Sequence, residues 1–120
     1  MAATFDHHLA QGISLLEAGE NKKAEAEFRR CTEIEPSNAE GYFQLGDCLA
    51  MDERMEEAIE SYLRGLKLAP EDTEALTALG DIYFELGRHK EALDAYGKAL
   101  DLTANRVEKA YLQRRVAEFA

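Results

Sequence analysis

The sequence predicts an all-α protein: a superhelical solenoid of three antiparallel helical hairpins, closed by a C-terminal solvating helix. One observation is the abundance of Ala, Leu, Glu and Lys, which gives most of the 120 residues a high helix propensity. Another is a repeat of 34 residues, seen first in Gly12, Gly46 and Gly80. Pro36 and Pro70 share that spacing. Such a period is typical of arrays in which each hairpin buries its apolar face against a neighbour.

Further columns keep the same register, so we place the repeats at residues 5–38, 39–72 and 73–106. Small residues let the two helices of a hairpin approach closely, and large residues fill the space around them. Each proline stops the second helix of its hairpin, because it has no N–H and its ring clashes with the preceding turn. The small and aromatic columns are Ala24, Ala58 and Ala92, and Phe28, Tyr62 and Tyr96.

The first repeat is the least typical of the three, as expected at the exposed end of a stack. His8 and Gln11 replace the bulky and apolar residues of its first helix. The adjacent His7 and His8 invite a metal hypothesis, but neighbouring helical residues point about 100° apart and cannot easily share one ion. We therefore predict no metal site. Cys31 shares its column with the small residues Gly65 and Ala99, which indicates a buried structural role.

In the second repeat we expect a helix that opens with a capping box formed by Ser37 and Glu40. The turn inside this hairpin is unusual. Glu53 stands where the first and third hairpins have Gly19 and Gly87, so we expect a different or strained backbone at this residue.

The third repeat ends without a proline, since Ala104 stands in that place. We expect Asn105 and Glu108 to form the capping box of a terminal helix over residues 107–120. An apolar stripe on this helix would cover the open end of the stack, as helical arrays need for solubility. The predicted stripe consists of Val107, Ala110, Tyr111 and Ala117.

These columns resemble those of the tetratricopeptide repeat family over about 102 residues, three times the period of 34. The resemblance implies a single repeat domain over residues 1–120, in which the first helix of each hairpin lines a concave groove. It also implies which places in each repeat face a ligand. The resulting peptide-binding groove would consist of Leu9, Ile13, Leu16, Glu40, Phe43, Gln44, Asp47, Met51, Glu74, Thr77, Asp81, Phe84 and Glu85.

Apolar residues lie toward the first repeat of this groove, and carboxylates lie beside them in the second and third. Our hypothesis is a basic amphipathic peptide or partner segment, with apolar anchors toward repeat one and Lys or Arg toward repeats two and three. The alternative is that the carboxylates are simply solvated and the apolar places pack against a neighbouring repeat or subunit. A clamp for a C-terminal carboxylate is not expected, because Gln44 and Glu74 supply no cation there.

The net charge of −10 argues against nucleic acid and anionic membranes as partners. No secretory signal, membrane span or CxxC pair is evident, so we expect a reducing, cytoplasmic location. The sequence has no GxSxG, phosphate-loop or HExxH motif, and we predict a protein without cofactor or enzymatic activity.

A protein-interaction scaffold or adaptor is therefore the function that the sequence favours. A small chaperone like those of type III secretion is the alternative, although such chaperones usually carry an N-terminal dimerisation helix that this sequence is not expected to have. We also keep a hypothesis of weak self-association, in which the mildly basic terminal helix of one copy docks on an acidic repeat of another.

Overall fold

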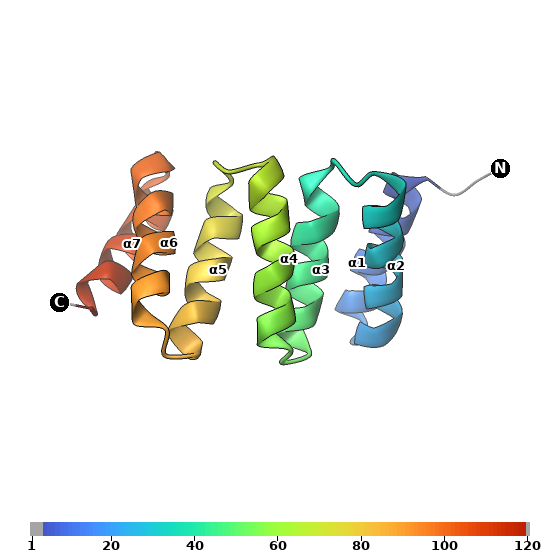
Figure 1. Cartoon of the computed structure of the whole chain (residues 1–120), viewed down its shortest axis with the longest axis horizontal. Coiled ribbons are helices and arrows are strands. Elements are labelled where there is room, and N and C mark those ends of the chain that lie inside the picture. The colour runs from blue at the N-terminus through green and yellow to red at the C-terminus, as the bar shows by residue number, and fades with distance from the viewer. Residues whose placement is uncertain (1–3, 120) are drawn as a thin grey trace. The chain divides into compact units, whose positions relative to one another are not determined.

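A computed structural model of the protein describes residues 4–119, and all regular elements in this range are α-helices (Figure 1). The first helix of each hairpin begins at the residue where the sequence places the start of a repeat, so the predicted fold class is confirmed. The helices are α1 (Phe5–Glu17), α2 (Asn21–Ile34), α3 (Ala39–Met51), α4 (Met55–Leu68), α5 (Thr73–Glu85), α6 (His89–Leu102) and α7 (Arg106–Ala117).

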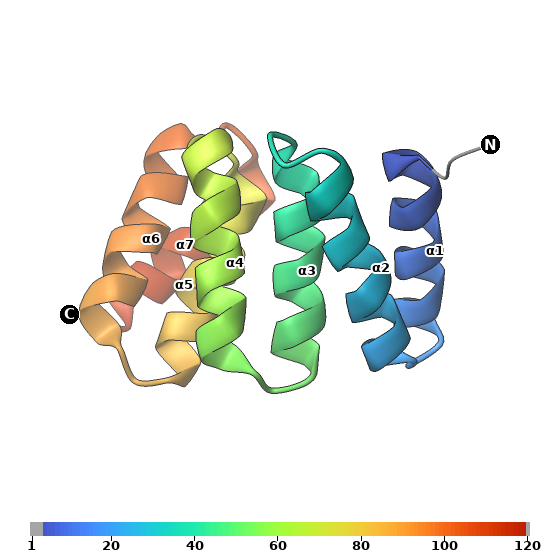
Figure 2. The ribbon, with the colours of Figure 1, turned by 45° about the vertical axis from the view of Figure 1, so that its right-hand side comes forward.

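The chain divides into two compact units, Met1–Ala69 and Pro70–Ala120. The first unit contains α1 to α4, which run antiparallel to their neighbours and lie side by side (Figures 1 and 2). The second contains the hairpin of α5 and α6, with α7 running obliquely across it (Figure 2). One repeat domain over residues 1–120 remains a prediction.

Within each hairpin the two helices are close because a glycine faces an aromatic ring. A Cβ atom added to Gly12 would lie 2.4 Å from Cε1 of Phe28, and one on Gly80 would lie 2.7 Å from Cδ1 of Tyr96. In the second hairpin Gly46 faces the ring of Tyr62 in the same way. Such distances leave no room for a side chain. The small and aromatic columns of the sequence are thus the two sides of one contact.

The three turns inside the hairpins share one left-handed backbone conformation. The φ angle is 80° at Gly19, 60° at Glu53 and 74° at Gly87. Glu53 is the only non-glycine residue with positive φ among residues 4–119. The strain expected at this residue is therefore present, because a Cβ atom disfavours this conformation.

Neither predicted capping box is complete: the Asn105 side-chain cap is present, but the Asn105 N–H donates to Thr103 Oγ1 (3.2 Å) and not to Glu108. The side chain of Asn105 caps α7 by accepting a hydrogen bond from the Glu108 N–H (2.9 Å). For α3, however, the capping residue is Asn38, whose side chain accepts from the Glu40 N–H (3.0 Å), and the prediction of Ser37 was wrong. The reason is local: α3 begins at Ala39, so the residue directly before it occupies the capping position.

The buried face of α7 also differs from the predicted stripe. Val107 is 81% exposed, and Ala110 and Ala117 are exposed as well. Leu112, by contrast, is completely buried, and Tyr111 beside it is half-buried. The half-buried Arg115 shares this face, and its long aliphatic stem lets it line a helix contact that a hydrophobicity pattern does not reveal.

Candidate peptide-binding surfaces

The first candidate surface belongs to α1 and α3, which contact each other in the first unit. We call it the α1–α3 surface. Leu9, Ile13 and Leu16 of α1 are half-buried, so part of each apolar side chain still meets solvent. On α3, Glu40 in the first turn and Met51 in the last residue are exposed, Met51 by 60%. This surface thus combines accessible apolar atoms with a carboxylate.

Phe43, although predicted for the groove, is a core residue of the second hairpin. It is 8% exposed and packs on Gly65 of α4, where an added Cβ atom would lie 2.4 Å from Cε1 of the ring. Its ring also stacks with Tyr62 at a centroid distance of 6.4 Å. A ligand would meet little of this side chain. Gly65 occupies the small column of the repeat, and a glycine there makes room for an aromatic ring on the facing helix.

The carboxylates at the centre of the predicted row are already engaged inside their hairpins. Tyr62 donates its hydroxyl to Asp47 Oδ1, and Tyr96 donates to Asp81 Oδ1 at 2.5 Å. Both aspartates are half-buried. Sequence reasoning placed them in the groove and missed these bonds. The sequence held the signal, because the two columns change together: the pairs are Ile13 with Phe28, Asp47 with Tyr62, and Asp81 with Tyr96.

Gln44, the remaining predicted residue on α3, is half-buried and donates its amide to Glu40 Oε1 at 2.9 Å. This bond joins two side chains one turn apart on α3, and Glu40 remains exposed to solvent. The second unit offers similar carboxylates at the two ends of α5, where Glu74 and Glu85 are exposed. Thr77 turns its hydroxyl to the Thr73 carbonyl (2.8 Å) and adds no free donor.

The C-terminal half of α5 contacts α7 through Asp81 and Phe84, and we call this the α5–α7 contact. Tyr111 donates its hydroxyl to Asp81 Oδ1 at 2.5 Å. The Arg115 guanidinium lies 4.4 Å from the centroid of the Phe84 ring, and Phe119 meets the same ring edge-on at 5.7 Å. The capping helix therefore occupies two places that the sequence assigned to a ligand.

Tyr96 of α6 and Tyr111 of α7 both donate their hydroxyls to Asp81. Burial, followed by the hydrogen bond to the Asp81 carboxylate, raises the pKa of Tyr96 far above its ordinary value. The same two causes raise the pKa of Tyr111, although the hydrogen bond from Arg115 acts in the opposite direction. Arg115 Nε donates to the Tyr111 hydroxyl at 3.1 Å. A chain of bonds thus runs from the guanidinium through the phenol to the carboxylate.

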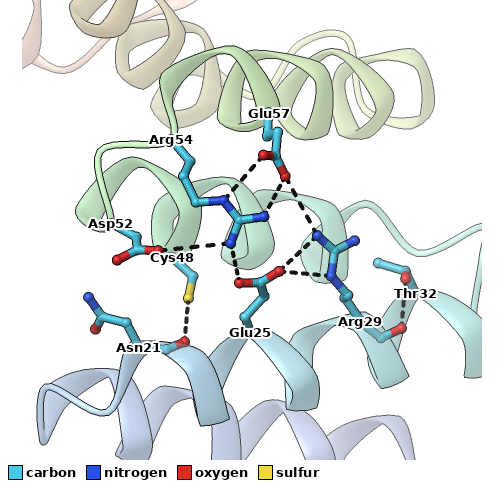
Figure 3. A network of polar contacts seen from close by, with 8 residues as sticks. All are labelled: Asn21, Glu25, Arg29, Thr32, Cys48, Asp52, Arg54 and Glu57. Carbon is cyan, nitrogen blue, oxygen red and sulfur yellow. Dashed lines mark hydrogen bonds and ion pairs between the residues drawn. The ribbon is translucent and has the colours of Figure 1, made fainter.

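A polar cluster in the first unit links α2 to the beginning of α4, and we call it the Arg54 cluster (Figure 3). Arg54 Nη1 lies 2.6 Å from Glu25 Oε1, and Arg54 Nη2 lies 2.6 Å from Glu57 Oε2. Arg29 Nη2 contacts the other Glu25 oxygen at 2.9 Å. Asp52 lies 3.8 Å from Arg54 Nη1. Because Glu25 bridges two arginines, the cluster fixes the second hairpin on the first.

The charge state of Glu25 follows from these contacts. Burial raises the pKa of this carboxyl, but hydrogen bonds from Arg29 and Arg54 together outweigh burial and hold the pKa below its ordinary value. Charge-assisted bonds of this kind are stronger than neutral ones. Sequence reasoning did not find the cluster, because Arg54 is separated from Glu25 by 29 positions and only the packing of the hairpins joins them.

Both cysteines are buried, as the sequence predicted for Cys31. Cys31 donates weakly to the Phe5 carbonyl (3.7 Å), and Cys48 to the Asn21 carbonyl (3.3 Å). Burial, with lesser contributions from nearby carboxylates, raises the pKa of each thiol to about 11. Both are therefore protonated and poorly nucleophilic at neutral pH.

No cluster of three His, Cys, Asp or Glu side chains suited to a metal occurs among residues 4–119. His8, which entered the metal hypothesis, instead contacts Glu27 through Nδ1 at 2.5 Å. A search of the same residues also finds no helix long and apolar enough to cross a membrane.

Comparison with solved structures shows the same fold in several helical-repeat proteins. The type III secretion translocator chaperone SycD of Yersinia enterocolitica is 19% identical, with a TM-score of 0.85 over 98% of this chain and 89% of SycD. MamA is 21% identical, with a TM-score of 0.79 over 95% of this chain and 77% of MamA. YrrB, described as a TPR protein with an unusual peptide-binding site, is 22% identical, with a TM-score of 0.83 over 94% of this chain and 58% of YrrB.

Comparison with the curated proteins gives no significant match. Two family models described as tetratricopeptide repeat match the sequence itself, one over residues 37–105 and the other over residues 8–38. The first match alone covers more than half of the chain. The hairpins, their glycine–aromatic contacts and these matches agree, and the chain belongs to the tetratricopeptide repeat family.

Proposed function

We propose that the protein is an interaction scaffold that holds a peptide or a segment of a partner protein on the first helices of its hairpins (α1, α3 and α5), which we call the inner helices. The observation that supports this most directly is the α1–α3 surface, where half-buried Leu9, Ile13 and Leu16 accompany the exposed Glu40 and Met51. Accessible apolar side chains beside carboxylates are suited to an amphipathic segment that carries Lys or Arg.

The charge of the protein favours the same ligand. Its net charge of −10 attracts basic segments and repels anionic ones, which adds to the rate of encounter as well as to selectivity. On α3 the exposed Glu40 is the carboxylate best placed to meet a partner cation: among residues 4–119 its side chain accepts only from the Gln44 amide beside it and the backbone around it stays open to solvent, whereas Asp47 is half-buried and accepts the Tyr62 hydroxyl. The segment would place its apolar anchors against α1 and its Lys or Arg toward α3.

The test is a pull-down from native lysate with the wild-type chain, Glu40→Lys and a matched control, Glu33→Lys. Glu33 is exposed on α2, so both variants change the net charge equally. We expect Glu40→Lys to lose the partners that wild type and Glu33→Lys recover. Equal recovery by all three proteins would refute an α1–α3 binding surface. Reversal of Asp47 or Asp81 is a poorer test, because it would also break a hairpin hydrogen bond.

A dedicated chaperone is the second candidate, favoured by the fold shared with SycD over 98% of this chain. The two functions differ in the state of the bound partner. A chaperone would hold its client unfolded, whereas an adaptor would bind one segment of a folded protein. Hydrogen exchange on the recovered complex decides between them: protection confined to the bound segment indicates a chaperone, and protection throughout the partner indicates an adaptor.

A further inference from the structure

Three side chains of the C-terminal segment form a stripe over the face of α5 that carries Asp81 and Phe84, which we call its inner face. Tyr111 and Arg115 are four residues apart, which places them on one face of α7, and Phe119 follows at the same spacing just beyond the helix end. The stripe contacts Asp81 by a hydrogen bond, and Phe84 by a guanidinium and a ring edge. These two residues of α5 are places that the repeat pattern assigns to a ligand. The stripe also meets α6, where Phe119 lies edge-on to His89 (5.3 Å) and Tyr111 edge-on to Tyr96 (6.5 Å).

Outside the stripe, α7 packs mainly against α6, and its buried face is small. Leu112 is its only buried residue, whereas α5 buries six. Glu108 places one carboxylate oxygen, Oε1, in a buried position without a hydrogen-bond partner, which costs stability. In the loop before α7, Ala104 replaces the proline found at the ends of the first two repeats. The stripe is therefore a major part of what holds α7 on α5.

We propose that the inner face of α5 is a binding site for a helical partner segment with an aromatic residue, an arginine and a second aromatic residue at four-residue spacing, and that α7 is a resident copy of this ligand which the partner displaces. This proposal rests on the scaffold function and names the partner class for the second unit. Asp81 accepts the phenol of the first aromatic residue, and the Phe84 ring receives the guanidinium and the second aromatic edge.

The resident helix must lower the apparent affinity for a partner. A ligand that binds only the open state is weakened in proportion to the fraction of molecules in which α7 is away from α5. Loosening α7 without changing α5 should then tighten partner binding. A capping helix that no outside segment can displace gives a different result: loosening it destabilises the hairpin and leaves the peptide affinity unchanged.

The experiment measures binding of a fluorescent synthetic peptide with the sequence of residues 106–119 to the full chain. The loosened variant carries Tyr111→Phe and Arg115→Gln, which remove the phenol and the guanidinium but keep Leu112. The matched control is Arg114→Gln, an exposed neighbour on the same helix. We expect the loosened variant to bind the peptide at least about tenfold more tightly than wild type or control. A peptide with the same two changes should bind the loosened variant at least about tenfold more weakly than the parent peptide does.

A second measurement covers the case in which the loosened variant fails to fold, which circular dichroism would reveal. A fluorophore is attached through Val107→Cys, since residue 107 is exposed and the native thiols are buried. Unlabelled peptide should lower the anisotropy of this probe by freeing α7, and a scrambled peptide should not.

Several results would overturn the proposal. These are equal peptide affinity for the wild type and a folded loosened variant, no binding to that variant, or an unchanged anisotropy of the labelled helix. A dimer that disappears in the loosened variant would assign the stripe to exchange of α7 between copies and would also overturn it. None of these results bears on the α1–α3 surface, which the Glu40→Lys pull-down tests separately.

Discussion

Glu53 shows what a single residue contributes to this fold. Its amide donates to the Ala50 carbonyl at 3.0 Å, and the next amide, Arg54 N–H, donates to the Leu49 carbonyl at 2.9 Å. Gly19 and Gly87 begin the same pair of bonds in the other hairpins. The turn therefore forms by the same helix-ending hydrogen bonds whether or not glycine is present, and the glutamate adopts a φ of 60° to make them.

Glu53→Gly is expected to stabilise the protein by about 1 kcal/mol, because glycine adopts this conformation without a Cβ penalty. The free energy of unfolding from urea titration measures the effect. Gly19→Ala is the reciprocal change, since nothing lies within 4 Å of an added Cβ atom and only the backbone responds. It should lower the same free energy. A destabilising Glu53→Gly would contradict the strain.

Gly80 and Gly97 form a matched pair for the close contact inside the third hairpin. An alanine Cβ atom at position 80 would lie 2.7 Å from the Tyr96 ring, whereas nothing lies within 4 Å of one at position 97 in α6. We expect Gly80→Ala to destabilise by about 1–3 kcal/mol through overpacking. Gly97→Ala should stabilise by up to about 1 kcal/mol through helix propensity. Thermal unfolding of both variants measures the difference, and equal midpoints would show that the contact does not limit packing.

At the scale of elements, α7 shows that a helix can be predicted correctly while its buried face is not. Asn105 and the absence of breakers after it indicate a helix, and one is present. The buried face is centred on Leu112 with Tyr111 and Arg115 beside it, so Tyr111 was predicted correctly, whereas Val107, Ala110 and Ala117 lie outside this face.

Leu112→Ala should therefore destabilise the second unit by about 2–4 kcal/mol, because it removes the one completely buried side chain of α7. Val107→Ala, at a residue that is 81% exposed, should change the free energy of unfolding by less than about 0.5 kcal/mol. Urea titration followed by circular dichroism compares them. A similar loss of unfolding free energy in both variants would show that Val107 also belongs to the buried face of α7.

The Arg54 cluster predicts how the attachment of the second hairpin to the first depends on pH. The pKa of Glu25 in the folded protein lies below the unfolded value of 4.5. Near pH 4 the unfolded chain then binds more protons at this group, so its ion pairs stabilise the fold above pH 4.5 and are lost as pH falls through the folded pKa. Glu25→Gln should cost about 1–2 kcal/mol at pH 7 and progressively less below pH 4.5.

The measurement is the free energy of unfolding at several pH values between about 7 and 3, compared for the wild type and Glu25→Gln. Glu33→Gln, at an exposed residue of the same helix, is the control. A constant difference between the wild type and Glu25→Gln across this range would show that the carboxylate charge does not hold the hairpins together.

At the scale of the whole molecule, charge governs what the scaffold attracts. The chain contains 24 acidic and 14 basic residues, which gives a net charge of −10. Raising the salt concentration from about 0.05 M to about 0.5 M shortens the screening length several-fold. We expect partners recovered through the α1–α3 surface to bind more weakly at the higher concentration, as measured by quantitative pull-down. Recovery that rises with salt would indicate that apolar contacts alone carry binding.

The sequence by itself determined the helical hairpins, their number and their register. It did so because each depends on local chemistry: a small residue facing an aromatic one, a proline or a left-handed turn, repeated every 34 positions. It also identified the inner helices as the candidate surface through the family resemblance, and that assignment awaits the binding tests.

Only the tertiary structure decided which of those inner residues are still accessible. The Phe43 ring fills the space above Gly65, and Asp47 accepts the Tyr62 hydroxyl. Asp81 and Phe84 are in contact with side chains of α7. Each of these depends on side chains brought together from different helices, and the meeting of Glu25 with Arg54 does so as well. Repeat spacing fixes where a residue lies on its own helix, whereas its partners depend on the rotation and packing of the next one.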